Sequence, residues 1–342
     1  MYRLPTTPSP AARARARWRQ TLHWLAIVVC VLPAATSAGL DDPGHAEAVL
    51  TRGVEFSDAP RSMQPADPVT VRRPAGSDLA ISLDQQLYDL LAPAIRDYAR
   101  QHHLKIRMQR GNCGQSAAGL RRHLVDIGGF CCPPGDKDRL PGLRFHTLGI
   151  GALAIVTHPD ANIESLSQQQ VRDIFSGKTR QLAAARGRPP IPLHLVTRLH
   201  CRSRPGHWHL ILPEEENFFP LANQTGGINE MLSAVEGYIG AIGYETLYWI
   251  SRHAPDLKVL HIDGMDPAAP HNLLHGNYPY YRVFNITSWS HQDGSEDQVS
   301  LLIEWLKSYF EQVAGLADMI PAGKLREAGW KFRNDELVGG PE

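Results

Sequence analysis

An alternation of two hydrophobic patterns at the start of the folded region is the strongest constraint on what this chain can form. Short apolar or alternating runs predict strands, and between them apolar residues recur at helical spacing. The predicted elements are strands at 79–82, 103–108 and 125–129 and helices at 87–98 and 115–124. The order strand, helix, strand, helix, strand is typical of a parallel α/β unit.

A second α/β unit follows the first. Strands are predicted at 151–157, 191–196, 241–244, 259–262 and 281–287, and helices at 205–212, 228–235 and 298–313 and from Leu166 onward. We expect Ser165 to cap the helix that begins at Leu166. Leu301 and Leu302 are both expected in the apolar stripe of the helix at 298–313, together with Trp305, Leu306 and Phe310. The predicted fold class is therefore α/β.

The N-terminal segment has the three-part layout of a secretory signal. Four arginines between Arg13 and Arg19 precede an apolar run at 24–32, and Thr36-Ser37-Ala38 supplies small residues for cleavage. We therefore expect residues 1–38 to be a signal peptide and the mature protein to lie in the periplasm. An uncleaved anchor and lipidation at Cys30 stay open as alternatives. Residues 39–77 have no sustained period and are expected to form a loosely ordered lead-in.

Composition and motifs exclude several classes of function. Five of the 35 basic residues precede position 39, so the remainder carries a net charge of about −5, which disfavours a nucleic-acid partner. Beyond the signal, no apolar run reaches the roughly 18 residues of a membrane span. The sequence has no Gly-x-Ser-x-Gly elbow and no Walker loop. We expect a monomer with no cofactor and no enzyme activity.

Five strings along the chain carry a resemblance to a known family. They are residues 125–129, 148–156, 166–178, 240–244 and 278–282. Among them, Asp-Ile-Phe-Ser-Gly-Lys at 173–178 and Gly-Ala-Ile-Gly-Tyr at 240–244 are the most specific. In this order, over about residues 78–315, the sequence resembles the periplasmic phosphate-binding proteins of ABC transporters.

The resemblance implies a fold and a function. The fold would be a type II periplasmic-binding-protein fold with two lobes, each a mixed, mainly parallel sheet flanked by helices, joined by two crossover strands. Lobe 1 would comprise residues 78–152 and 263–342, and lobe 2 residues 153–262. The function would be that of an exported solute-binding protein, which captures phosphate or a related oxyanion between the lobes and presents it to a membrane permease.

The resemblance also indicates ligand residues, and here the sequence departs from the family. Ser82, Gln115 and Ser116 would donate neutral hydrogen bonds, and Arg198 and Arg202 would pair with the anion. The family's small Ser-Gly-Thr residues after the arginine are missing. Cysteines 131 and 132 follow Gly129-Phe130 where the family carries a carboxylate. A more highly charged anion or an organic acid therefore becomes a candidate ligand.

The cysteines permit more than one chemistry. Cys113, Cys131, Cys132 and Cys201 all fall beside loops that the resemblance maps to the ligand site. An even number in an oxidising compartment predicts disulfides, and we favour Cys113 with one of the adjacent pair. Metal binding, with His200 as a further ligand, and free thiols stay open. The alternative functions are an exported metal-handling or redox-accessory protein on the same scaffold, and a sensory or structural module without a transport role.

Overall fold

The computed structural model describes residues 76–132, 134, 138–182, 190–198, 211–212, 218–290 and 297–341. All of them belong to one compact unit, Ala59–Glu342. The predicted helix at 205–212 and the positions His200, Cys201 and Arg202 fall wholly or mostly outside the described residues. Within the described ranges, each helix falls short of the length and apolarity that a membrane crossing requires.

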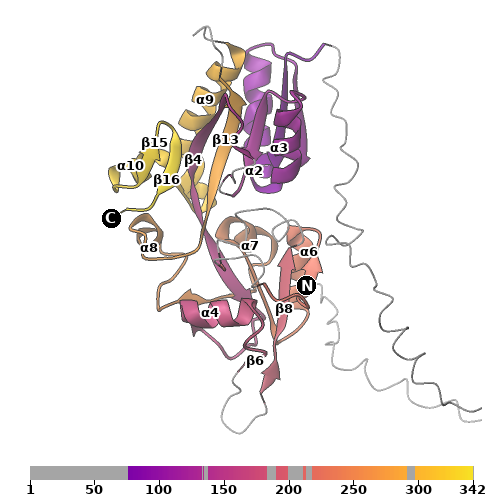
Figure 1. Ribbon diagram of the computed structural model, residues 1–342, viewed down its shortest axis with the longest axis vertical. Helices are drawn as coiled ribbons and strands as arrows, with labels where there is room; N and C mark the ends of the chain where they lie inside the picture. Colours follow the sequence, from indigo (N-terminus) through magenta and orange to yellow (C-terminus); the bar gives the residue numbers. More distant parts are fainter. Residues whose placement is uncertain are drawn as a thin grey trace, which may run out of the picture. The chain divides into compact units, whose positions relative to one another are not determined.

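A mixed sheet organises the described residues. Its strands run in the order β2 (Ile106–Gly111), β1 (Leu79–Asp84), β3 (Ile127–Phe130), β13 (Tyr281–Trp289), β4 (Leu143–Thr157), β10 (Ala241–Thr246), β8 (His194–Arg198) and β9 (Asn223–Thr225). Strand β1 pairs in parallel with β2 and β3, as the alternation of strands and helices predicts. Strand β13 is antiparallel to both β3 and β4, so two long neighbouring strands, β4 and β13, run through the middle of the sheet (Figure 1).

Shorter strands complete the described structure. Strands β11 (Lys258–Val259) and β14 (Met319–Pro321) pair with β4. Three separate two-stranded sheets are formed by β5 (Ser165–Leu166) with β12 (His261–Ile262), β6 (Gln181–Leu182) with β7 (Ile191–Pro192), and β15 (Lys331–Arg333) with β16 (Glu336–Gly339). The predicted strand at 259–262 is thus divided between two sheets.

Strand β4 begins eight residues before the predicted start at 151. The prediction missed these first residues because buried Phe145 and Thr147 alternate there with the less buried Arg144 and His146. That half-polar segment lacks the continuous apolar run by which the rest of the strand is recognised.

Helices pack on the sheet around two hydrophobic cores. They are α2 (Gln85–Gln101), α3 (Cys113–Arg121), α4 (Gln168–Phe175), α6 (Ile228–Glu236), α7 (Leu247–His253), α8 (Pro270–Leu274), α9 (Gln298–Val313), the 3₁₀ turn η6 (Ala314–Ala317) and α10 (Ala322–Glu327). We call the core formed mainly by β1, β3, α2, α3 and α9 the first core, and the core formed mainly by β8, β10, α4, α6 and α7 the second core. Helices α7, α8 and α10 are too short to show a clear period in the sequence.

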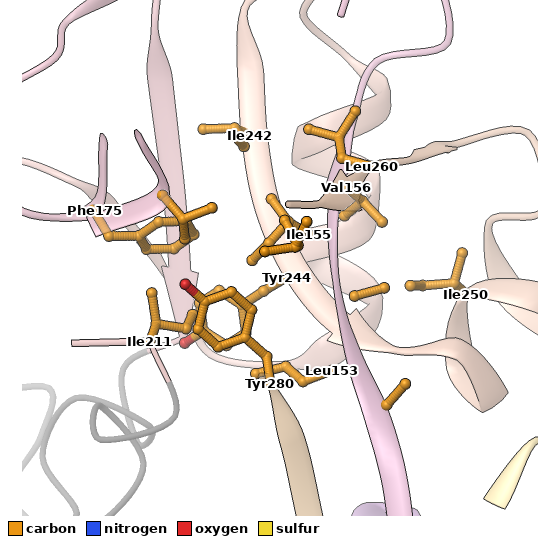
Figure 2. Close-up of a cluster of buried hydrophobic side chains, with 14 of the residues drawn as sticks. Leu153, Ile155, Val156, Phe175, Ile211, Ile242, Tyr244, Ile250, Leu260 and Tyr280 are labelled. Carbon is orange, nitrogen blue, oxygen red and sulfur yellow. The ribbon is translucent and has the colours of Figure 1, made fainter. Parts of the chain in front are cut away.

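Strand β4 contributes to both cores. Phe145 and Leu148 lie in the first core, and the stretch from Ala152 to Val156 lies in the second. Successive side chains of a strand point to opposite faces, and both faces are buried here. Figure 2 shows Phe175 of α4 and Ile250 of α7 on opposite sides of the β4 residues. This strand therefore ties the two cores together.

A glycine permits the pairing of β14 with β4. A Cβ atom at Gly149 would lie 2.2 Å from the carbonyl oxygen of Ile320, so any larger residue would force the two backbones apart. Gly149 pairs with Pro321 in this ladder. The close approach brings the C-terminal segment onto the strand that both cores share.

The helix predicted to begin at Leu166 begins two residues later. Its N-cap is Ser167, not Ser165: the Ser167 hydroxyl accepts from the Gln170 amide at 3.1 Å, and the Gln170 side chain accepts from the Ser167 amide at 2.7 Å. Ser165 lies instead in β5, and its hydroxyl donates to His261 O. The reciprocal capping box decides the start, because it satisfies two amides that the helix leaves open.

Replacing Ser167 with alanine is expected to lower the free energy of unfolding by about 1 kcal/mol, the usual loss for an N-cap hydroxyl. The matched variant Ser165→Ala removes an exposed hydroxyl outside the helix and is expected to cost less than about 0.5 kcal/mol. Urea unfolding of both variants measures the difference. A larger loss for Ser165→Ala would contradict the assigned cap.

Candidate functional site

The side chain of Glu245, at the end of β10, is the centre of a buried polar network. Its Oε1 accepts from Gln86 Nε2 at 2.9 Å and from the Thr246 amide at 2.8 Å, and its Oε2 accepts from Arg198 Nη1 at 2.9 Å. Arg282 Nε lies 3.5 Å from Oε1. We call Gln86, Arg198, Glu245, Thr246 and Arg282 the Glu245 network. Every member of it is buried.

The network joins segments that belong to the two different cores. Gln86 lies in the first turn of α2, on the first core, whereas Arg198 ends β8 and Glu245 lies in β10, both on the second. Gln86 is engaged at both ends of its amide, because its Oε1 also accepts from Thr246 Oγ1 at 2.9 Å. Arg282 comes from β13, one of the two long central strands. Four separate elements therefore meet at one carboxylate.

Chemically, the network is an arrangement of cations around an oxyanion. The side chains of Arg198 and Arg282 are 2 % and 0 % exposed, so both guanidinium groups are withdrawn from water. Buried charges need close partners, and the planar guanidinium group binds oxyanions such as carboxylate and phosphate through a fixed fork of N–H donors. The oxyanion that these two guanidinium groups surround is the carboxylate of Glu245. The same donors are suited to an oxyanion that enters from outside.

The predicted hydroxyl donors Ser82 and Ser116 lie together. Ser82 is in β1 and Ser116 in α3, and their Oγ atoms are 3.2 Å apart, while Ser116 Oγ also donates to Ser82 O at 2.9 Å. Both are buried. They come together because parallel strands β1 and β2 end at the same edge of the sheet, where the following helices begin.

Gln115, the third predicted neutral donor, caps its own helix. Its Oε1 accepts from the Asn112 amide at 3.0 Å, and Asn112 Oδ1 accepts from the Gln115 amide at 3.0 Å. This capping box fixes the start of α3, so the side chain has a structural use. Among the predicted charged residues, Arg198 lies in the Glu245 network and Arg202 lies outside the described residues.

Three of the predicted cysteines are brought together in the first core; we call them the thiol cluster. Cys113 is the first residue of α3, and Cys131 and Cys132 directly follow β3. Cys113 Sγ lies 3.6 Å from Cys131 Sγ and 3.3 Å from Cys132 Sγ, and no disulfide joins the described cysteines. The pairing of Cys113 with one of the adjacent cysteines therefore stays a prediction.

A carboxylate completes this cluster from another strand. The side chain of Asp84, at the end of β1, offers an oxygen that lies with the sulfurs of Cys113 and Cys131 in one group, all within 4.8 Å of one another. Burial raises the pKa of Asp84 and that of the Cys113 thiol. The pKa of Cys131 is raised mainly by its interaction with Cys113. A carboxylate thus lies beside Cys131, which follows Gly129-Phe130 where the resemblance leads us to expect an acid.

Five residues of these two clusters were not among the predicted site residues. They are Asp84, Gln86, Glu245, Thr246 and Arg282. One signal was present in the sequence: Glu245 and Arg282 each adjoin an apolar strand segment, Ala241–Tyr244 and Val283-Phe284, where a charged residue is buried only if it is paired. Gln86 carries no such signal, because a glutamine in the first turn of a helix is ordinarily exposed.

With this geometry, the described residues form the two-lobed fold of periplasmic binding proteins. No protein-family model matches the sequence. Among solved structures, an ABC-type phosphate transport receptor from Vibrio cholerae is similar with a TM-score of 0.58 and 18% identity, over 71% of this chain and 99% of that one. A putative phosphate ABC transporter substrate-binding protein from Clostridium perfringens, with bound phosphate, has a TM-score of 0.60 and 15% identity over the same shares. The predicted fold is confirmed, and at these identities the likeness concerns the fold.

Proposed function

We propose that this protein is an exported solute-binding protein that captures a small anion between its two lobes and delivers it to the permease of an ABC-type transporter. The shared fold with two transport receptors supports a solute-binding role. In this proposal residues 1–38 are the signal peptide, residues 39–77 the lead-in, and the mature protein acts in the periplasm as a monomer. Lobe 1 comprises 78–152 and 263–342, lobe 2 comprises 153–262, and no catalytic step is involved.

The observation that carries the proposal is the pair of buried arginines around the Glu245 carboxylate. Arg198 and Arg282 reach this oxyanion from different strands, which is the arrangement that a second oxyanion needs. Ser82 and Ser116 would add neutral donors from the first core, and Gln115 and Arg202 remain the further ligand residues of the proposal. Phosphate is the first candidate. The missing family carboxylate leaves sulfate, molybdate and organic acids as close alternatives.

Because the network is buried, binding requires the two lobes to separate. Opening would break the contacts of Gln86 with Glu245 and Thr246, which connect helix α2 to the end of β10. Hinge motion of this kind is the usual closing movement of two-lobed receptors. The carboxylate of Glu245 then competes with the solute for the guanidinium groups. The apparent affinity of the receptor is accordingly lower than that of the arginine pair alone.

A thermal-shift screen of the mature protein tests this function. We expect one of phosphate, sulfate, molybdate or a carboxylic acid to raise the melting temperature, because a ligand that binds only the native state adds about 2.7 kcal/mol of stability at a concentration of 100 Kd. The variant Glu245→Gln keeps a hydrogen-bonding side chain and removes the competing charge, so the same anion is expected to bind at least several-fold more tightly.

The matched control is Glu304→Gln, which removes a largely exposed carboxylate paired with Lys307. It is expected to leave the anion response unchanged. Absence of a shift with every anion, in both the natural sequence and Glu245→Gln, would overturn the proposal. An equal gain in affinity for both variants would mean that general charge, and not the network, controls binding.

The second candidate function is an exported metal-handling protein on the same scaffold. It is favoured by the thiol cluster, whose sulfurs lie 3.3 and 3.6 Å apart. The same residues also permit a redox role, in which Cys113 would form a disulfide with Cys131 or Cys132. A metal would require these thiols in the reduced state.

A further inference from the structure

Asp84, Cys113 and Cys131 bring three potential metal donors within 4.8 Å of one another in one buried place, and Cys132 lies beside Cys113. The sulfurs of Cys113 and Cys131 are 3.6 Å apart, and that of Cys132 is 3.3 Å from Cys113. In a tetrahedral zinc site with Zn–S bonds of about 2.3 Å, neighbouring sulfurs are about 3.8 Å apart. These two sulfur–sulfur separations differ from those of a zinc site by a few tenths of an ångström, whereas Cys132 lies outside the group that Asp84, Cys113 and Cys131 form.

The orientation of Asp84 is a second, independent observation. Its Oδ1 caps helix α2 by accepting from the amides of Gln86 and Leu87. Its Oδ2 is buried, and the described residues supply it with no N–H or O–H donor. The thiol of Cys131 is its neighbour. A buried carboxylate oxygen whose neighbour is a thiol is suited to coordinate a cation, because the cation would compensate the negative charge of the carboxylate.

The chemistry of the donor set selects among metals. Three sulfurs and one carboxylate oxygen suit Zn²⁺, a borderline-soft ion that accepts both kinds of ligand, better than Cu⁺, which prefers sulfur alone. Thiolates in a dry site need such a cation, because burial disfavours their charged form. Arg282, which interacts electrostatically with Asp84, offsets part of the negative charge that three thiolates and a carboxylate would leave around one zinc ion.

We propose that Asp84, Cys113 and Cys131 bind one Zn²⁺ ion, and that the side chain of Cys132, which lies beside Cys113, turns toward the ion to supply the fourth ligand. All four positions are then filled by the protein, as in structural zinc sites. The ion would join the ends of β1 and β3 to the start of α3 and so stabilise the first core. Binding releases the thiol protons to solvent, and no oxidant or reductant is involved. Its ligands lie outside the Glu245 network, and Arg282 is the residue that interacts with both Asp84 and Glu245.

Metal analysis of the whole mature protein, purified under reducing conditions and dialysed against excess Zn²⁺ and then buffer, tests the proposal. We expect one zinc per chain by mass spectrometry, an increase in melting temperature that a chelator reverses, and thiolate charge-transfer absorption when Co²⁺ replaces zinc. Cys113→Ser and Cys131→Ser are expected to lose the metal, and Cys132→Ser to bind it at least tenfold more weakly. The matched control Cys201→Ser is expected to keep one zinc per chain.

A further variant covers the case in which the serine substitutions fail to fold. Asp84→Asn retains an oxygen that caps α2 but removes the carboxylate, so it is expected to fold and to bind zinc at least tenfold more weakly. Four results would overturn the proposal: less than about 0.2 zinc per reduced chain, binding of Cu⁺ without Zn²⁺, unchanged affinity in Asp84→Asn, or loss of zinc in Cys201→Ser. A disulfide in the air-purified protein combined with no zinc uptake after reduction would assign the cluster to disulfide formation.

Discussion

Replacing Arg198 with methionine is expected to lower the free energy of unfolding by about 3–5 kcal/mol, the loss that follows when one partner of a buried ion pair is removed. The guanidinium donates to Glu245 Oε2 at 2.9 Å, and the two side chains are 2% and 0% exposed. Methionine fills a similar volume but leaves the carboxylate without this partner in a dry environment. Denaturant unfolding of the mature protein measures the loss.

An exposed arginine of the same chain supplies the control. Arg110 makes two hydrogen bonds to Asp89 at 2.9 and 3.1 Å, but both side chains are partly in water. Arg110→Met is therefore expected to cost no more than about 1 kcal/mol. In the double variant Arg198→Met with Glu245→Gln the loss is expected to be smaller than the sum of the two single losses, because the removed charges are partners. A cost below about 1 kcal/mol for Arg198→Met alone would contradict the assigned network.

The second large effect is expected at Leu302 in helix α9. Leu302→Ala is predicted to lower the free energy of unfolding by about 2–5 kcal/mol, because the side chain is fully buried in the first core and its removal leaves a cavity. The preceding residue, Leu301, is 47% exposed. Leu301→Ala is expected to change the free energy by no more than about 0.5 kcal/mol.

These two substitutions are chemically identical and lie side by side, so context is the only variable. Urea unfolding curves with equal slopes would allow a direct comparison of their midpoints. Equal losses at the two positions would contradict the assigned burial. The sequence placed both leucines in one apolar stripe, and that prediction was wrong for Leu301, because adjacent residues are about 100° apart around a helix and the buried stripe is narrower than the hydrophobic one.

Local patterns were sufficient for most of the fold. The helix at 298–313 was predicted with the bounds that α9 has, and the parallel arrangement of β1, β2 and β3 follows from the helices between them. Errors arose where the local signal was ambiguous. The choice between Ser165 and Ser167 as the cap is an example, since either residue type can begin a helix and only the reciprocal bonds with Gln170 decide.

The candidate site was predicted less completely than the fold. The sequence pointed to Ser82, Ser116, Arg198 and the cysteines, and the structure brings the two serines together and three cysteines together. It did not point to Glu245, Gln86 or Arg282. Those residues are far apart in the chain, and the periodicity of the sequence, which reflects local structure, does not show contacts between distant residues.

By itself the sequence determined the α/β class, the order of the longer strands and helices, and which segments are apolar enough to form the two cores, because these depend on patterns within about ten residues. Only the tertiary structure decided that Arg198 and Arg282 meet the carboxylate of Glu245, and that Asp84 lies beside the sulfurs of Cys113 and Cys131. Such pairings follow from the way β4 and β13 align the rest of the sheet. Buried charges and thiols acquire their chemistry from neighbours that the chain brings together on folding.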